Sequence, residues 1–362
     1  MKKENIVITI ILMIFMLNLS GCFEFFSNNE DKIIYQSFPT KIRYEISYGY
    51  KINCTGTGKY SINYNCDIPE LINGDIISLI TQDNNYEEKT LATTNTVKQW
   101  NITGYDNNNY NLGISAIIEA ESYLVSDLNG LNALNINDIK IQYPYLINQY
   151  CKSQSNGTSI FINSKNTQIS SLANSIKINA GTNNSFIVAK DIFIWLKQNT
   201  NYKTHSNNNI QTAEYTLQYK TGDCDDLSFL YISLCRSIGI PSRFIRGFLI
   251  EEKTAISHAW AEIFVGENSG NNGWIPVECA GVSGEIKKEI NQNFGTESAG
   301  HLRLFIDDGS NESINASLST LLLVRYSPNI DIYPQSYTKI NYYYQLESNE
   351  LVIDEDNHRY YQ

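Results

Sequence analysis

Cys224 is the residue in this sequence with the clearest capacity for chemistry. It lies in the segment Gly222–Asp226, and the apolar residues that follow it recur at helical spacing, at Leu227, Leu230, Tyr231, Leu234 and Ile238. Gly239 and Pro241 end this pattern. The cysteine is therefore expected in the first turn of a helix, where the positive end of the helix dipole favours the nucleophilic thiolate.

Two further residues complete a possible catalytic set. His258 opens the predicted strand His258–Val265, and Glu278 ends the predicted strand Trp274–Glu278. A thiol on a helix, an imidazole on one strand and a carboxylate on the next can converge although they are far apart in sequence. That set has the residue types of a nucleophile, a base and a group that orients the base.

Other residues near these three favour structural roles. The carboxylates of Asp223, Asp225 and Asp226 disfavour a thiolate, but they can also bind the free N–H groups of the helix. We expect Asp226, like Trp260 and Trp274, to support the site without reacting.

Alternative interpretations of the polar residues carry less weight. A zinc site built from Cys224, His258 and Glu278 lacks the usual ligand spacing, so no metal is predicted. His205 and His301 are weaker catalytic candidates. Arg243 and Arg246 flank two apolar strand residues and are expected to form structural ion pairs.

The order of these motifs resembles the transglutaminase-like superfamily. The resemblance rests on Gly222–Leu227, Leu234–Phe244, His258–Trp260 with Glu262, and Gly273–Glu278, and it covers about residues 165 to 306. It implies an α+β fold with a papain-like core, a triad formed by Cys224, His258 and Glu278, and no cofactor. The family usually has Asp where this chain has Glu278, which is longer by one methylene, so the carboxylate keeps its role only if its strand lies slightly farther from the ring.

The N-terminus has the features of an export signal. A basic start at Met1–Lys3 is followed by the apolar run Ile6–Leu17, which is too short to span a membrane as a stable helix. Leu19–Cys22 resembles the lipobox of secreted lipoproteins, which implies that Cys22 carries a lipid. The body is then expected outside the cytoplasm, anchored to the membrane by that lipid; a plain secretory signal or an uncleaved anchor is the alternative.

The remaining sequence predicts the domain organisation. Short β-branched and aromatic runs between turn-rich pieces predict an antiparallel β-sandwich-like domain ahead of the core. The expected segments are a signal with the lipidated cysteine, a tether, the sandwich, a connector, the transglutaminase-like domain and a β-rich extension with a polar tail, at residues 1–22, 23–40, 41–128, 129–165, 166–310 and 311–362.

Cysteine positions and charge limit the function further. Cys54 and Cys66 flank a glycine-rich turn in a possible hairpin, where a disulfide is plausible outside the cell. The net charge of −11 and a pI near 4.9 argue against nucleic-acid binding.

Together these features predict an extracytoplasmic thiol enzyme that acts on amide bonds of surface or cell-wall peptides. Hydrolysis is favoured, protein cross-linking is the alternative within the same chemistry, and a non-catalytic surface-binding lipoprotein is the alternative from another class. The oligomeric state stays open.

Overall fold

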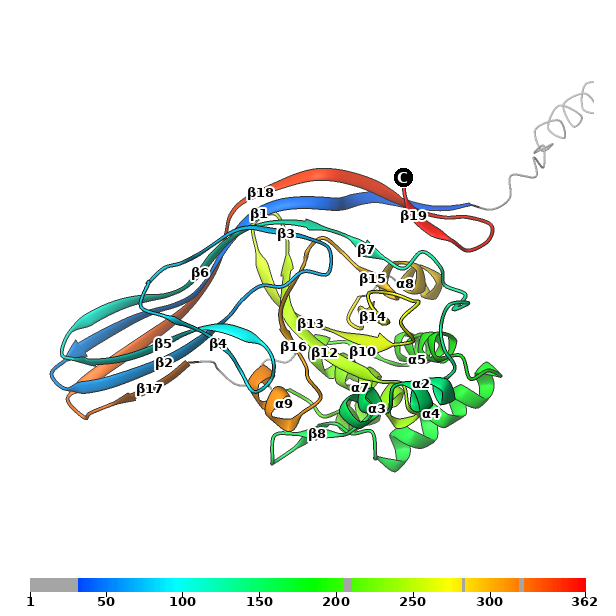
Figure 1. The fold of residues 1–362 in the computed structure, drawn as a ribbon, viewed down its shortest axis with the longest axis horizontal. Helices are drawn as coiled ribbons and strands as arrows, with labels where there is room; N and C mark the ends of the chain where they lie inside the picture. The colour runs from blue at the N-terminus through cyan, green and yellow to red at the C-terminus, as the bar shows by residue number, and fades with distance from the viewer. Residues whose placement is uncertain (1–31, 205–209, 282–283, 319–321) are drawn as a thin grey trace, which may run out of the picture.

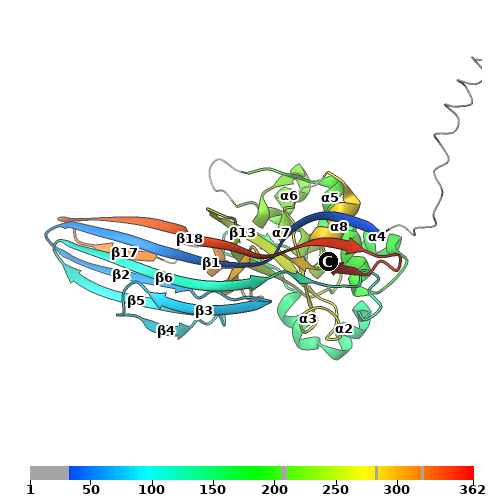
Figure 2. The same cartoon turned by 90° about the horizontal axis from the view of Figure 1, so that it is seen from above.

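The computed structural model describes residues 32–204, 210–281, 284–318 and 322–362. These residues form an elongated molecule with a β-sheet arm at one end and a mixed helical and strand body at the other (Figures 1 and 2). The helices all lie in the body, and the sheets are antiparallel apart from one short parallel pair, so the predicted α+β class is confirmed. Within the described ranges, no helix is long and apolar enough to cross a membrane.

Two antiparallel sheets build the arm. The five-stranded sheet has the order β19(Arg359–Tyr361), β18(Ile330–Ile353), β1(Ile33–Gly56), β6(Asn108–Glu121) and β3(Gly74–Thr81). The four-stranded sheet has the order β17(Leu322–Tyr326), β2(Lys59–Asp67), β5(Thr96–Tyr105) and β4(Glu87–Thr90). Alternate residues of β2, from Tyr60 to Cys66, are buried, as expected for a strand with one face in a core.

The body is organised around a sheet with the order β14(Trp274–Val277), β13(Ala255–Phe264), β12(Ser242–Ile250) and β16(His301–Ile306). Its larger helices are α4(Thr167–Ala180), α5(Ser185–Asn199) and α7(Cys224–Ser237). The shorter helices are α2(Ile136–Gln142), α3(Pro144–Tyr150), α6(Ala213–Tyr219), α8(Ile286–Asn293) and α9(Asn311–Leu318). Three two-stranded pairs complete it: β10(Asn201–Tyr202) with β11(Thr221–Gly222), β7(Tyr123–Leu124) with β15(Thr296–Glu297), and β8(Gln154–Ser155) with β9(Ile160–Ile162).

Helix α7 is the centre of the body core. The predicted apolar stripe from Leu227 to Leu234 is buried and belongs to one cluster with side chains of α4, α5, β12 and β13. The helix ends before Gly239, whose φ of 91° is a left-handed conformation that favours glycine, as the sequence predicted. The arm and the body also share a core, because Leu302 and Leu304 of β16 pack in the cluster of the arm.

The C-terminal strands differ in their role from the predicted extension. The long strand β18 pairs with β1 along almost its whole length, and β17 pairs with β2, so C-terminal strands help to build the arm. The start of β1 and β19 lie over the body (Figure 1). The last twelve residues, predicted as a polar tail, contain the end of β18 and all of β19. Strand β1 begins at Ile33, inside the segment predicted as a tether, and the predicted connector contains helices α2 and α3.

The structure contradicts the predicted disulfide. Cys54 and Cys66 are both buried free thiols. The prediction assumed that their strands form a hairpin, but β1 and β2 belong to different sheets, so the glycine-rich turn between them crosses from one layer of the arm to the other. Burial raises the pKa of both thiols. Cys22 lies outside the described residues.

Candidate active site

Cys224 is the first residue of α7, directly after the short strand β11. Asp223 caps the helix, and its N–H donates to Oδ2 of Asp226 at 3.2 Å. Gly222 makes this tight strand-to-helix connection possible, because a Cβ there would lie 2.6 Å from the Cβ of Asp226. The cysteine is partly exposed, and its backbone is fixed by the parallel pairing of β11 with β10.

Asp226 has the structural role that the sequence predicted. It is fully buried, and in addition to its bond from Asp223 its Oδ1 accepts the backbone N–H of Gln211 at 2.6 Å. These bonds join the start of α7 to the segment that precedes α6. Asp226 therefore supports the loop that presents the cysteine.

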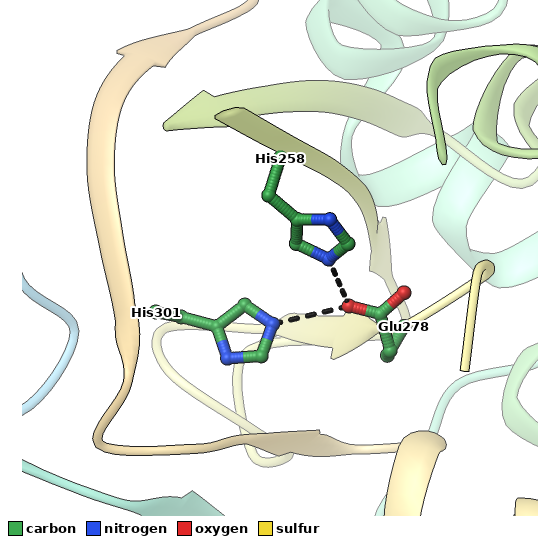
Figure 3. Close-up of side chains that lie close together, drawn as sticks. All are labelled: His258, Glu278 and His301. Carbon is green, nitrogen blue, oxygen red and sulfur yellow. Dashed lines mark hydrogen bonds and ion pairs between the residues drawn. The ribbon is translucent and has the colours of Figure 1, made fainter. Parts of the chain in front are cut away.

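His258 and Glu278 meet beside this helix terminus. Nε2 of His258, on β13, lies 2.6 Å from Oε2 of Glu278, directly after β14 (Figure 3). The His258 side chain also forms a hydrogen bond with Cys224. Because Glu278 occupies Nε2, the nitrogen available to the thiol is Nδ1. The structure thus brings together the three residues that the sequence selected.

The pKa values of the imidazole and the carboxylate move apart. Burial disfavours the charged ring, but the charge of Glu278 and the hydrogen bonds with Cys224 and Glu278 outweigh it and raise the pKa of His258 to about 10. Burial also disfavours the Glu278 carboxylate, yet His258 and His301 hold its pKa well below the usual range. At neutral pH the ring is positive and the carboxylate negative, and a positive ring beside the sulfur favours the thiolate.

Asp225 carries less negative charge than the sequence implies. Burial, a hydrogen bond with Asp223 and the charges of Asp223 and Asp226 raise the pKa of Asp225 to about 9. This carboxyl group is therefore protonated at neutral pH. The acidic segment around Cys224 therefore carries one negative charge fewer than its three carboxyl groups would give if all were ionised.

His301 is a fourth polar residue at the site. Its Nε2 lies 3.0 Å from Oε2 of Glu278 (Figure 3), and its Nδ1 lies 2.8 Å from Oγ of Ser298. The sequence marked His301 only as a weak candidate, because its one visible signal was a position just before a predicted strand. His205 lies outside the described residues.

Trp260 and a buried ion network support the imidazoles. The indole stacks on the ring of His258, with centroids 5.8 Å apart, and donates Nε1–H to Glu297 at 3.0 Å. Arg303 binds both Glu297 and Glu262, at 2.5 and 2.6 Å. Glu262 also pairs with Arg243 at 2.6 Å, and Arg246 pairs with Asp67, so the predicted ion pairs of both arginines are confirmed.

Trp274 lies elsewhere. Its ring packs against Tyr150 and Phe264, and the guanidinium of Arg243 lies 4.1 Å from its centroid. It belongs to a separate small core cluster with α2 and α3. Trp274 thus holds helix α3 against the sheet and has no ring contact with the histidines.

A cavity of about 280 Å³ is lined by residues that lie close in sequence to Cys224 and Glu278. Its lining includes Leu227, one turn after Cys224, and Cys279 and Ala280, which follow Glu278. Tyr202 also lines the cavity. Burial raises the pKa of Tyr202, and so do nearby negative charges, those of Cys224, Asp223, Asp225 and Glu278. The hydroxyl of Tyr202 therefore lies near the site. Cys224, His258 and Glu278 are not themselves among the lining residues of this cavity.

Two groups of side chains could in principle bind a metal ion. Ligand atoms of His258, Glu278 and His301 lie within 4.8 Å of one another, as do those of Asp223, Cys224 and Asp225. In the first group, hydrogen bonds already explain the short distances. The zinc ligand set considered from the sequence differs, since Cys224 is not in the group that contains the histidines.

The comparisons agree with this arrangement of helix and strands. Residues 171–279 match the family model of the transglutaminase-like superfamily, so the chain contains a transglutaminase-like domain over these residues. No curated protein matches the chain.

Several solved structures are similar to this chain at low sequence identity. A putative cysteine protease from Cytophaga hutchinsonii is 16% identical, with a TM-score of 0.50, 92% of this chain covered and 100% of that chain. The periplasmic domain of TgpA from Pseudomonas aeruginosa is 9% identical, with a TM-score of 0.34, 67% of this chain covered and 92% of that chain. Red sea bream transglutaminase is 8% identical, with a TM-score of 0.29, 83% of this chain covered and 73% of that chain. At such identities the first likeness concerns the fold alone, and the other two carry no further argument.

Proposed function

We propose that this protein is a thiol-dependent acyl-transfer enzyme that acts on amide bonds, with Cys224 as nucleophile. The observation that carries the proposal is that one ring contacts both partners: the His258 side chain forms a hydrogen bond with Cys224, and its Nε2 lies 2.6 Å from Oε2 of Glu278. A thiol, an imidazole and a carboxylate in this order can form and break a thioester.

The proton steps follow from the charges. The sulfur of Cys224 attacks the carbonyl carbon of an amide, and the C–N bond breaks as the His258 imidazolium gives its Nδ1 proton to the leaving amine. The neutral ring then takes a proton from water or from an acceptor amine, which attacks the thioester and releases Cys224. Glu278 accepts Nε2–H throughout and stabilises the ring each time it becomes positive.

Hydrolysis is our preferred outcome of the second step, and a surface or cell-wall peptide is the proposed substrate. The partly exposed thiol supports this choice, because water can reach the thioester. Cross-linking would need an amine that reaches the thioester before water does. The proposed setting is extracytoplasmic, with the body attached to a membrane through a lipid on Cys22.

The test uses wall peptides with a labelled primary amine and analysis by mass spectrometry. We expect cleaved peptides from the purified protein and none from Cys224→Ala. Cys151→Ala is the matched control, since Cys151 is a free, half-buried cysteine at the C-terminus of α3 whose pKa burial raises to about 12. Incorporation of the amine would instead identify a cross-linking enzyme.

A non-catalytic binding protein would behave differently toward alkylating reagents. The proposal predicts that iodoacetamide labels Cys224 stoichiometrically and faster than the other cysteines, and that His258→Ala abolishes this difference. Slow and equal labelling of the cysteines in the wild-type protein would contradict an enzyme and favour the binding protein.

A further inference from the structure

Glu278 receives hydrogen bonds from two imidazoles at one oxygen. Its Oε2 lies 2.6 Å from Nε2 of His258 and 3.0 Å from Nε2 of His301, and its Oε1 accepts the N–H of Ala280 at 2.7 Å. We propose that His301 is a positioning residue that holds Glu278 in the orientation the His258–Cys224 pair requires. This inference rests on the proposed function, because it concerns how the same thiol is activated.

The length of Glu278 explains why a positioning residue is needed. A glutamate has one more rotatable bond than an aspartate, so its carboxylate can leave the ring more easily and loses more freedom when it is fixed. Three N–H donors surround the Glu278 carboxylate, and two of them do not belong to His258. Besides His258, these donors are His301 of β16, which contacts Oε2, and the backbone N–H of Ala280, which binds Oε1.

The tautomer of His301 is set by its partners. An ionised carboxylate can only accept, so Nε2 of His301 must carry a hydrogen. In the neutral ring Nδ1 then accepts, and the hydroxyl of Ser298, 2.8 Å away, is its donor. The ring is buried, with 9% of its side chain exposed, and its edge meets the face of Trp260 at 4.9 Å. The donor aimed at Glu278 is therefore rigid.

The sheet brings the two histidines together across a glycine. Strand β12 lies between β13 and β16, and adjacent strands are about 4.8 Å apart, so the backbones that carry the histidines are about 10 Å apart. Gly247 of β12 pairs with His258, and Leu249 pairs with His301, which places both rings on one face. No side chain at Gly247 separates the rings, whose centroids are 5.5 Å apart.

No other residue fits at position 247. A Cβ there would lie 1.8 Å from the carbonyl oxygen of Leu302, where the register between β12 and β16 shifts. The absence of a side chain at Gly247 thus allows both the close approach of β12 and β16 and the contact between the two imidazole rings. Both ring nitrogens of His301 have partners, since Nδ1 contacts Ser298 and Nε2 is directed at the carboxylate of the site.

The test measures the rate of Cys224 alkylation by iodoacetamide from pH 5 to pH 10. His301→Phe removes the donor and should lower the rate at pH 7 by roughly ten- to a hundredfold. His301→Gln keeps an N–H donor at a similar reach and should keep most of the rate. His358→Phe is the matched control, because His358 is half-exposed and pairs with a different carboxylate, Asp354, at 3.5 Å.

A double-mutant cycle separates positioning from a general structural role. In a Glu278→Gln background, His301→Phe should have no further effect on the alkylation rate, because the carboxylate that His301 positions has already been removed. An undiminished loss in that background would overturn the inference, as would a wild-type or faster rate in the single His301→Phe variant. If His301→Phe does not fold, Ser298→Ala decides: a lower rate supports the inference and an unchanged rate overturns it.

The same assay distinguishes this inference from the proposed function. If alkylation does not depend on His258, the proposed function fails and the inference fails with it. If alkylation depends on His258 but not on His301, only the inference is overturned.

Discussion

Nε2 of His258 lies 2.6 Å from Oε2 of Glu278. A glutamate therefore contacts the imidazole at the position where the transglutaminase-like family, which this sequence resembles, usually has an aspartate. The side chain does reach the ring, because Glu278 stands just beyond the last paired residue of β14. From this backbone position the longer side chain of Glu278 places its carboxylate within hydrogen-bond distance of the His258 ring.

Shortening this side chain should impair the site. Glu278→Asp withdraws the carboxylate by about 1.5 Å, so it can no longer bind both histidines and Ala280. We expect amide turnover and Cys224 alkylation to fall roughly ten- to a hundredfold. The exposed Glu312, on α9, offers the control substitution of the same type, Glu312→Asp. Full activity in Glu278→Asp would show that the carboxylate position is not critical.

Amide turnover should decline at high pH. The pKa of His258 is raised to about 10, so the ring loses the proton needed by the leaving amine as the pH rises through that value. In Glu278→Gln the loss of negative charge lowers the pKa of His258, and the decline should begin at lower pH. A pH–rate profile measured on both proteins checks the direction, and an identical high-pH limb would contradict it.

Asp225 should make the fold less stable as the pH rises. Its pKa is raised to about 9, so its protonated form is favoured in the folded state; this contribution is complete below the ordinary pKa of Asp and is lost as the pH approaches 9. Asp225→Asn should therefore match the wild type near pH 4 and exceed its free energy of unfolding by more than about 1 kcal/mol near pH 8. Urea denaturation at both pH values measures the difference, and equal stability at pH 8 would argue against a protonated Asp225.

Metal removal should leave the thiol chemistry intact. His258, Glu278 and His301 have the residue types of a metal site, but the proposed reaction uses their hydrogen bonds. We expect EDTA to change neither the alkylation rate of Cys224 nor amide turnover. If EDTA abolished activity and zinc restored it, these residues would be metal ligands and the mechanism would have to be replaced.

The ion network beneath Trp260 should be important for folding. Arg303 is 3% exposed and neutralises Glu262 and Glu297, which are also buried. Arg303→Met leaves one of these carboxylates without its cation and should reduce the free energy of unfolding by about 3–5 kcal/mol. The exposed Arg325, on β17, offers the control Arg325→Met, which should change stability little. Equal stability of the two variants in chemical denaturation would contradict this role.

Much of the local structure could be predicted from the sequence. Helix α7 has a regular apolar stripe with a capping segment before it and Gly239 after it, so its position followed from periodicity alone. The predicted strands His258–Val265 and Trp274–Glu278 overlap the observed strands β13 and β14. Local patterns of this kind depend only on neighbouring residues.

Relations between distant segments could not be predicted in this way. The disulfide between Cys54 and Cys66 was inferred from a hairpin that does not exist, since β1 pairs with the C-terminal β18 and β2 with β17. The importance of His301 was missed for the same reason. Its contact with Glu278 depends on the order β14, β13, β12, β16 and on the absence of a side chain at Gly247.

The sequence by itself determined which side chains could react, because residue type and local periodicity placed a thiol at a helix start and an imidazole and a carboxylate on strands. Only the tertiary structure decided how these groups are charged and held. The approach of Glu278 raises the pKa of His258 against the opposing effect of burial, and the pairing of β12 with β16 brings a second imidazole to the same carboxylate. Both effects arise from distances between segments that are remote in the chain, and these distances exist only once the sheet has formed.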